Sequence, residues 1–187
     1  MPISKAGLNK TSAWLHAKGS LTARLRHHGA VTVHVVFEGA RPLWSHERHD
    51  LHCRNGYVRE VVLCINGRPA VWARSAISHA ALQGPWRAMT QLGNRPLAEL
   101  LFHRGANRRG RGPLRAMHLP QHGAIDAHIR AAWPENTRPR WARTSVFSRQ
   151  SEPLHLMEAF APWVFALPCL IQGKDSAHRS APTGGRQ

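Results

Sequence analysis

Residues 57–77 read YVREVVLCINGRPAVWARSAI, and this stretch decides the fold. Two runs rich in β-branched and apolar residues, 57–65 and 68–77, flank the dipeptide Asn66-Gly67. Asn-Gly between two such runs is the strongest short-range signal of a β-hairpin with a two-residue turn. The stretch therefore predicts two antiparallel strands joined by a tight turn.

This hairpin carries two arginines whose placement follows from the turn. A two-residue loop makes Ile65 face Arg68. Continuing that register makes Arg59 face Arg74, although like charges directly across a strand pair are destabilising. One interpretation is that both side chains reach water or pair with an acid such as Glu60. The other is that they bind a ligand with two carboxylates, since a guanidinium can hold a carboxylate through two hydrogen bonds.

A second hairpin is predicted from residues 141–149 and 152–160, with residues 150–151 as its turn. In its second strand Glu158 shares a face with three apolar side chains, Leu154, Leu156 and Phe160. The register of this turn places Glu158 opposite Arg143. One interpretation is a structural ion pair. The other is a carboxylate in an apolar pocket that accepts a proton or a hydrogen bond from a ligand.

The remaining predicted elements are short. Residues 20–26 favour a helix that Ser20 caps, and residues 31–38 alternate as a strand does. Residues 39–56 are interpreted as a connection. Two further helices and one strand are predicted at residues 85–92, 96–102 and 112–119. This order of helices and hairpins predicts an α+β domain with an antiparallel sheet, and the residues from 173 onward predict a disordered tail.

The chain is strongly basic, with 26 Lys and Arg against 10 Asp and Glu and a net charge of +16. Five arginines lie close together with no acid between them: Arg104, Arg108, Arg109, Arg111 and Arg115. A basic nucleic-acid-binding protein is therefore one alternative. However, the sequence has no zinc finger, RNP signature or basic zipper. The same charge would also attract an anionic small molecule.

Several classes of protein are disfavoured by the sequence. Cys53, Cys64 and Cys169 lack CxxC spacing, which argues against a disulfide framework and a structural zinc site. The spacing of His118, His122 and His128 is too irregular to predict a metal site. The longest apolar run, residues 159–171, is shorter than the about 20 residues of a membrane span. Residues 1–19 lack the apolar region of a secretory signal, so we expect a cytoplasmic protein without a bound metal.

Five groups of short motifs follow one another along the chain. They are SLTARL (20–25), VTV and FEG (31–39), REVVLC, GRP and ARS (59–75), GP, LG, RPL and LLF (84–102), and WAR, PL and EAF (141–160). In this order they resemble the bacterial chorismate pyruvate-lyases of ubiquinone biosynthesis. The resemblance covers residues 20–163 and is weakest over the basic segment 103–139.

The resemblance implies a single α+β domain at residues 20–165, in which helical flaps cover a ligand buried against an antiparallel sheet. Residues 1–19 would form a helical extension and residues 166–187 a disordered tail. It implies conversion of chorismate to 4-hydroxybenzoate and pyruvate, the first step of ubiquinone biosynthesis. It also implies a monomer that needs no metal or organic cofactor. We further expect that the protein spans no membrane and binds no nucleic acid.

The resemblance places the ligand-binding positions at Leu21, Arg59, Arg74, Leu97 and Glu158. Leu21 and Leu97 would act through the backbone. Arg59 would hold the ring carboxylate, and Arg74 would hold that of the leaving group. Glu158 would contact the ring hydroxyl, as a base or as an orienting acceptor. Arg59, Arg74 and Glu158 are therefore the expected catalytic residues.

Two alternative functions are compatible with this resemblance. A non-catalytic domain that binds small acids, like the effector domains of some bacterial transcription regulators, would have a similar fold. Only 19 residues precede Ser20, so we expect no DNA-binding winged helix before it. A chorismatase that adds water or forms another hydroxybenzoate is the second alternative.

Overall fold

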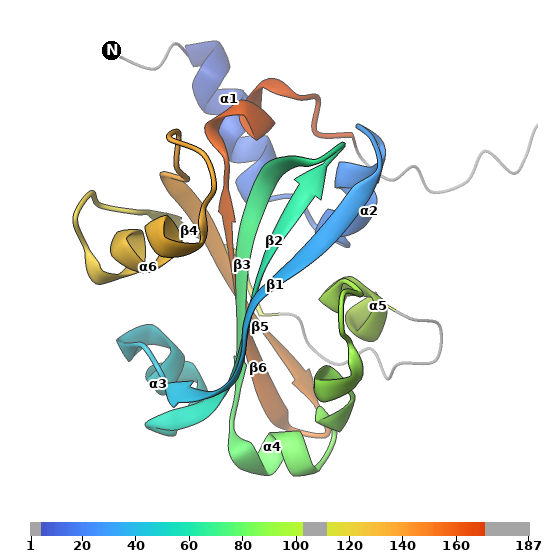
Figure 1. Ribbon diagram of the computed structural model, residues 1–187, viewed down its shortest axis with the longest axis vertical. Helices are drawn as coiled ribbons and strands as arrows, with labels where there is room; N and C mark the ends of the chain where they lie inside the picture. The colour runs from blue at the N-terminus through green and yellow to red at the C-terminus, as the bar shows by residue number, and fades with distance from the viewer. Residues whose placement is uncertain (1–4, 103–111, 171–187) are drawn as a thin grey trace, which may run out of the picture.

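Six strands form one antiparallel sheet in a computed structural model that describes residues 5–102 and 112–170, with only the backbone for residues 5–9. The strand order is β1-β2-β3-β6-β5-β4 (Figure 1). The strands are β1 (Val31–Pro42), β2 (Asn55–Ile65), β3 (Arg68–Ile77), β4 (Arg115–His118), β5 (Trp141–Arg149) and β6 (Glu152–Phe160). The predicted α+β class with an antiparallel sheet is confirmed.

Helices cover both faces of this sheet. Helices α2 and α5 lie over one face, here named the cavity face, and α3 and α6 lie over the other, named the network face (Figure 1). The α-helices are α1 (Lys5–Leu15), α2 (Leu21–Arg26), α3 (Ser45–Leu51), α4 (His79–Gln83), α5 (Leu97–Phe102) and α6 (Ala124–Ala132). Two 3-10 helices complete the described elements, η1 (Arg87–Gln91) and η2 (Pro162–Ala166).

The central hairpin has the predicted strands and turn but a different register. Asn66 and Gly67 both have positive φ, as a type I′ turn requires. Between Leu63 and Cys64 the pairing shifts by one residue, so β3 contains a bulge at Ala70. Because side chains alternate along a strand, a shift of one residue changes which side chains face each other.

The predicted pairing of the two arginines is therefore wrong. Arg59 pairs with Ser75, and Arg74 pairs with Glu60. Directly opposed residues point to the same face of a sheet, so the two arginines point to opposite faces. Arg59 lies on the cavity face and Arg74 on the network face.

The second hairpin agrees with its prediction. Gln150 and Ser151 have positive φ and form the turn, and Arg143 pairs with Glu158. Strand β6 then pairs with β3 and joins the two hairpins into one sheet. Ala73 and Glu158 are direct partners in this pairing. This junction places Glu158 next to the central hairpin.

The interpretation of residues 39–56 as a plain connection is wrong. Strand β1 continues to Pro42, and helix α3 forms at Ser45–Leu51. The capping interaction is a hydrogen bond from the backbone N–H of Trp44 to Glu47 Oε2 (2.8 Å). The predicted helix at residues 85–92 is a 3-10 helix in the structure, and α4 precedes it.

The core includes the chain segment around α1. Trp14 is fully buried in the main cluster with Trp72 and Phe160. Arg143 Nη1 donates to the carbonyls of Trp14 (3.1 Å) and Ala17 (2.8 Å), which fixes this segment to β5. No described helix is long and apolar enough to cross a membrane. Four of the five clustered arginines, and the tail beyond residue 170, lie outside the described residues.

Candidate functional site

A small cavity lies on the cavity face between the sheet and helices α2 and α5. Its walls are mostly apolar side chains, including Val33, Val61, Leu101, Phe102, Phe147 and Leu156. The polar side chains in its lining are those of Thr22, Arg59, Ser75 and Glu158. An apolar pocket with a few convergent polar groups is the usual form of a small-molecule site. It is the candidate functional site of this chain.

Arg59 supplies a cation to the cavity and is only partly satisfied by the protein. Arg59 is 1% exposed. Nη2 donates to the carbonyl oxygens of Gly93 (2.6 Å) and Arg95 (3.2 Å), and Nε has no hydrogen-bond partner. Burial lowers the pKa of Arg59, while the nearby Glu38 raises it. A buried guanidinium with a vacant donor is suited to bind an anion.

Glu38 is the nearest acid to Arg59, but it does not use the guanidinium fully. Glu38 Oε2 lies 3.8 Å from Arg59 Nε, which is too long for a hydrogen bond. The other carboxylate oxygen, Oε1, accepts a hydrogen bond from the hydroxyl of Tyr57. Burial, together with Glu38, raises the pKa of Tyr57, so the phenol stays a donor. Glu38 therefore offsets part of the charge and leaves Arg59 able to bind a carboxylate.

Glu158 supplies the carboxylate of the site. Its Oε2 accepts a hydrogen bond from Arg143 Nε at 2.6 Å, and Arg143 in turn donates to the carbonyls of Trp14 in α1 and of Ala17. The predicted ion pair therefore exists. Glu158 also lines the cavity, so the structural and the functional interpretations apply together. Arg143 fixes the carboxylate, and its other oxygen, Oε1, is the candidate acceptor for a ligand.

Leu21 and Leu97 lie at the first positions of α2 and α5, and both line the cavity. Ser20 Oγ accepts a hydrogen bond from the N–H of Ala23 (3.1 Å), as the predicted cap does. The first N–H groups of a helix have no partner within the helix and favour negative charge. Both helices can therefore present main-chain donors to a ligand.

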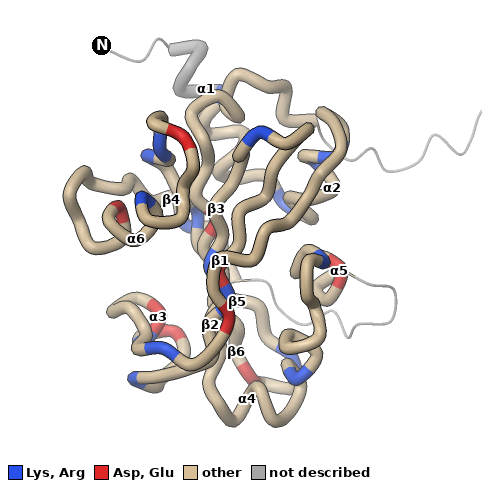
Figure 2. Tube along the Cα trace, in the orientation of Figure 1, with Lys and Arg blue, Asp and Glu red and all other residues tan. Residues whose placement is uncertain are grey.

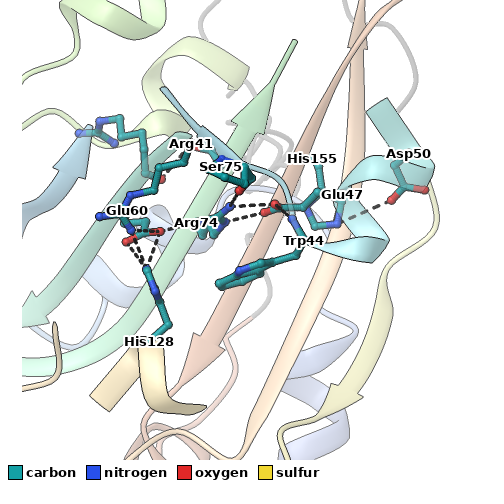
Figure 3. A network of polar contacts seen from close by, with 11 residues as sticks. Arg41, Trp44, Glu47, Asp50, Glu60, Arg74, Ser75, His128 and His155 are labelled. Atoms are coloured by element: carbon teal, nitrogen blue, oxygen red, sulfur yellow. Dashed lines mark hydrogen bonds and ion pairs between the residues drawn. The ribbon is translucent and has the colours of Figure 1, made fainter. Parts of the chain in front are cut away.

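Arg74 does not reach this cavity. On the network face its Nε donates to Glu47 Oε1 (2.6 Å) and its Nη1 to Glu60 Oε1 (2.6 Å), as Figure 3 shows. Its Nη2 donates to Glu47 Oε2 (2.9 Å), and the guanidinium stacks on the ring of Trp44 at 4.0 Å. Burial lowers the pKa of Arg74, but Glu47 and Glu60 together raise it above its usual value.

Arg74 belongs to a network that ties α3 and α6 to the sheet. His128 of α6 lies 2.8 Å from both oxygens of Glu60. Burial raises the pKa of Glu60, but the hydrogen bonds and charges of His128 and Arg74 outweigh it and lower that pKa. Figure 2 shows basic and acidic positions side by side in the middle of the sheet. We conclude that the guanidinium of Arg74 is used within the protein.

The structure thus brings together four of the five sequence-predicted site residues: Leu21, Arg59, Leu97 and Glu158. It separates Arg74 from them. The sequence analysis did not identify Glu38 as the partner of Arg59, although Glu38 belongs to the FEG motif (37–39) at the end of a predicted strand. It also missed the carbonyls of Gly93 and Arg95, for which the sequence contains no signal.

Comparisons with known proteins agree with this picture. A family model described as chorismate lyase matches residues 6–168. The probable chorismate pyruvate-lyase of Albidiferax ferrireducens is 37% identical over 183 residues, covering 90% of this chain and 92% of that protein. That of Bordetella avium is 36% identical over 154 residues, covering 80% of this chain and 75% of that protein.

Solved structures with a similar fold include a possible transcriptional regulator. A possible regulator from Bacillus subtilis, YydK, has a TM-score of 0.53 at 13% identity, covering 85% of this chain and 68% of that one. PhnF from Mycobacterium smegmatis has a TM-score of 0.55 at 15% identity, covering 78% and 64%. At such identities the similarity concerns the fold alone.

Proposed function

The chain belongs to the chorismate lyase family, and from this premise we propose that it is a chorismate pyruvate-lyase whose substrate binds between Arg59 and Glu158. It converts chorismate to 4-hydroxybenzoate and pyruvate, the reaction that opens ubiquinone biosynthesis. The observation that carries the proposal is Arg59, a buried cation on the cavity wall with a vacant donor. Chorismate carries two carboxylates, and a site of this kind binds one of them.

The residues of the cavity have distinct roles in this proposal. Arg59 holds the ring carboxylate, and Glu158 accepts a hydrogen bond from the ring hydroxyl. The N–H groups of Leu21 and Leu97 donate to ligand oxygens. Arg74 is no longer assigned to the carboxylate of the leaving group, because its donors are directed to Glu47 and Glu60. In this proposal the main-chain N–H groups at the starts of α2 and α5 contact the carboxylate of the leaving group instead.

The reaction requires orientation more than strong acid or base chemistry. The bond between the ring carbon and the ether oxygen breaks, a ring proton is lost, and the ring becomes aromatic. The leaving enolpyruvate takes up a proton and becomes pyruvate, so atoms balance without an oxidant or a reductant. Donors placed where charge develops and a fixed substrate orientation accelerate such a step. No metal or organic cofactor is needed for it.

Substrate entry requires movement of the helices over the cavity. The cavity has a volume of about 50 Å³, whereas an engineered protein cavity that binds one benzene ring has about 150 Å³. A ring with two acidic substituents is larger still. We therefore expect α2 and α5 to separate when substrate enters and when product leaves. We also propose that the enzyme is monomeric and cytoplasmic and that it retains 4-hydroxybenzoate under these helices.

The test is a turnover assay in which 4-hydroxybenzoate and pyruvate are both quantified by chromatography. The wild-type protein should form them in equal amounts and faster than chorismate decays alone. Arg59→Ala should lower kcat/KM about 100-fold or more, because it removes a charged contact in a buried site. Arg59→Ala also loses the hydrogen bonds to Gly93 and Arg95, so its thermal unfolding midpoint should fall, and circular dichroism at the assay temperature checks that it is still folded.

Arg68→Ala is the matched control, since Arg68 lies on the same hairpin with its side chain 55% exposed. It should retain full activity. Tight binding of 4-hydroxybenzoate without any turnover would instead support the non-catalytic domain. Formation of a different hydroxybenzoate would support a related chorismatase.

A further inference from the structure

Two histidines on the network face lie close together and are not used by the proposed reaction. His46 comes from α3 and His155 from β6, with ring centroids 5.0 Å apart. The ring nitrogens Nε2 of His46 and Nδ1 of His155 are buried and have no hydrogen-bond partner. His155 is 1% exposed. Buried polar atoms are nearly always paired, so two such nitrogens in one place call for a ligand.

The third group at this place is a carboxylate. One ligand atom each from His46, Glu47 and His155 lies within 4.8 Å of the other two. Glu47 accepts hydrogen bonds from Arg74 and from the N–H of Trp44. Glu47 Oε2 also accepts a hydrogen bond from Arg74 Nη2. Because each carboxylate oxygen has two lone pairs, Oε1 keeps one that can bind a cation.

We propose that His46, Glu47 and His155 form a binding site for a divalent transition metal ion, with zinc as the best match. Two imidazoles and one carboxylate with a fourth position open to water are a typical zinc ligand set. Tetrahedral zinc with bonds of about 2.1 Å spaces its ligand atoms about 3.4 Å apart. The three ligand atoms lie within 4.8 Å of one another without an ion, so small side-chain rotations can bring them to that spacing.

The surroundings of the three groups favour this ion. His155 Nε2 faces Asp50 Oδ2 at 3.6 Å (Figure 3), longer than a hydrogen bond, and a small shift would let Nε2–H donate to this carboxylate and leave Nδ1 for the metal. A carboxylate behind a histidine is the usual outer support of a metal ligand.

The charge balance near the site is also suitable. Glu47, Glu60 and Asp50 supply three negative charges near the fully buried Arg74, which supplies one positive charge. Arg41 adds a partly exposed cation at the far side of Glu60. A divalent ion therefore enters an acidic environment. Because two ligands come from α3 and one from β6, the ion would fix this helix to the sheet.

The experiment uses the full chain without a histidine tag and titrates it with Co²⁺, which replaces zinc and gives visible absorption bands in a tetrahedral site. The wild-type protein should bind one Co²⁺ per chain with these bands and release it when Zn²⁺ is added. His46→Ala should lose the bands. His49→Ala should retain them, because His49 is an exposed residue of the same helix.

A second readout guards against misfolded variants. Zn²⁺ should raise the thermal unfolding midpoint of the wild type and of His49→Ala but not that of His46→Ala, since only a ligand of the folded state stabilises it. The proposal is overturned if the wild type binds no Co²⁺ at micromolar concentration. It is also overturned if His46→Ala keeps the bands, or if His49→Ala loses them. None of these outcomes depends on chorismate turnover.

Discussion

Arg59 and Arg74 belong to the same hairpin and are equally buried, each 1% exposed, yet the two faces of the sheet treat them differently. On the network face, Arg74 meets two buried carboxylates and an aromatic ring. On the cavity face, Arg59 meets two main-chain carbonyls and a distant acid, and one of its donors is vacant. Burial alone therefore does not distinguish a structural charge from a functional one. The number of unsatisfied donors does.

The largest effect is expected from removing the satisfied arginine. Arg74→Ala leaves Glu47 and Glu60 buried without their main partner, so the free energy of unfolding should fall by about 3–5 kcal/mol. Urea unfolding measures this loss, with Arg68→Ala as the exposed control. The remaining folded protein should turn over chorismate at close to the wild-type rate. If Arg74→Ala is stable and inactive, the comparison of the two faces fails.

Acid should weaken the network face next. Burial lowers the pKa of His155 from 6.5 to about 4, with a further lowering from His46. Between these values the unfolded chain binds a proton that the folded chain does not. Stability is therefore full above pH 6.5 and falls by about 3 kcal/mol as the pH approaches 4.

The contribution of His155 to this pH dependence can be separated from that of His46, whose pKa burial also lowers. Urea unfolding in metal-free buffer between pH 7 and pH 5 should show a flatter profile for His155→Gln than for the wild type. The acid Glu60, whose pKa lies below its ordinary value of 4.5, does not contribute until the pH is lower. An unchanged slope in His155→Gln would assign the dependence to other groups.

On the cavity face, Glu158→Gln should have a smaller but distinct effect. The amide keeps the shape of the side chain and removes a charged acceptor, whose hydrogen bond is worth about 2 kcal/mol. We expect kcat/KM for chorismate to fall about 30-fold, with both products still formed in equal amounts. Circular dichroism and urea unfolding of the same variant report separately on the lost pairing with Arg143. Activity equal to the wild type would remove Glu158 from the site.

The smallest effect is expected at the mouth of the cavity. Phe102 of α5 is 44% exposed and packs edge-on against Phe147 at 6.1 Å. Phe102→Ala removes a contact worth about 1 kcal/mol and loosens the helix over the ligand. Release of 4-hydroxybenzoate, followed by stopped-flow fluorescence, should become about fivefold faster. A slower release would mean that Phe102 does not hold the helix closed.

Local signals in the sequence predicted the elements that depend on neighbouring residues. The Asn66-Gly67 turn, the cap at Ser20 and the pairing of Arg143 with Glu158 are all confirmed, because each depends on residues close in sequence. Helix α3 escaped prediction because its sequence, SHERHDL, has no apolar periodicity. It is held by contacts of Glu47 with a distant strand, and such contacts leave no local pattern.

The site was predicted in composition but not in geometry. Arg59 and Glu158 were identified from face and register, and the structure places both in the cavity lining. The role of Arg74 was misjudged because the bulge at Ala70 shifts the register, and its local marker, the neighbouring Pro69, does not fix which residue bulges. The carbonyls that hold Arg59 come from a loop far away in the sequence. They depend on how the chain packs, which no short motif encodes.

The bulge at Ala70 has a consequence for how the hairpin chooses its structure. In the regular register, without a bulge, two guanidiniums would oppose each other, whereas the observed register sets Arg74 against Glu60. Repulsion between the guanidiniums disfavours the regular register, and the attraction between Arg74 and Glu60 favours the observed one. The charges therefore help to determine the register of the two strands. The two arginines would repel each other in the regular register. They thereby help to select the observed register, in which Arg59 lines the cavity and Arg74 pairs with Glu60.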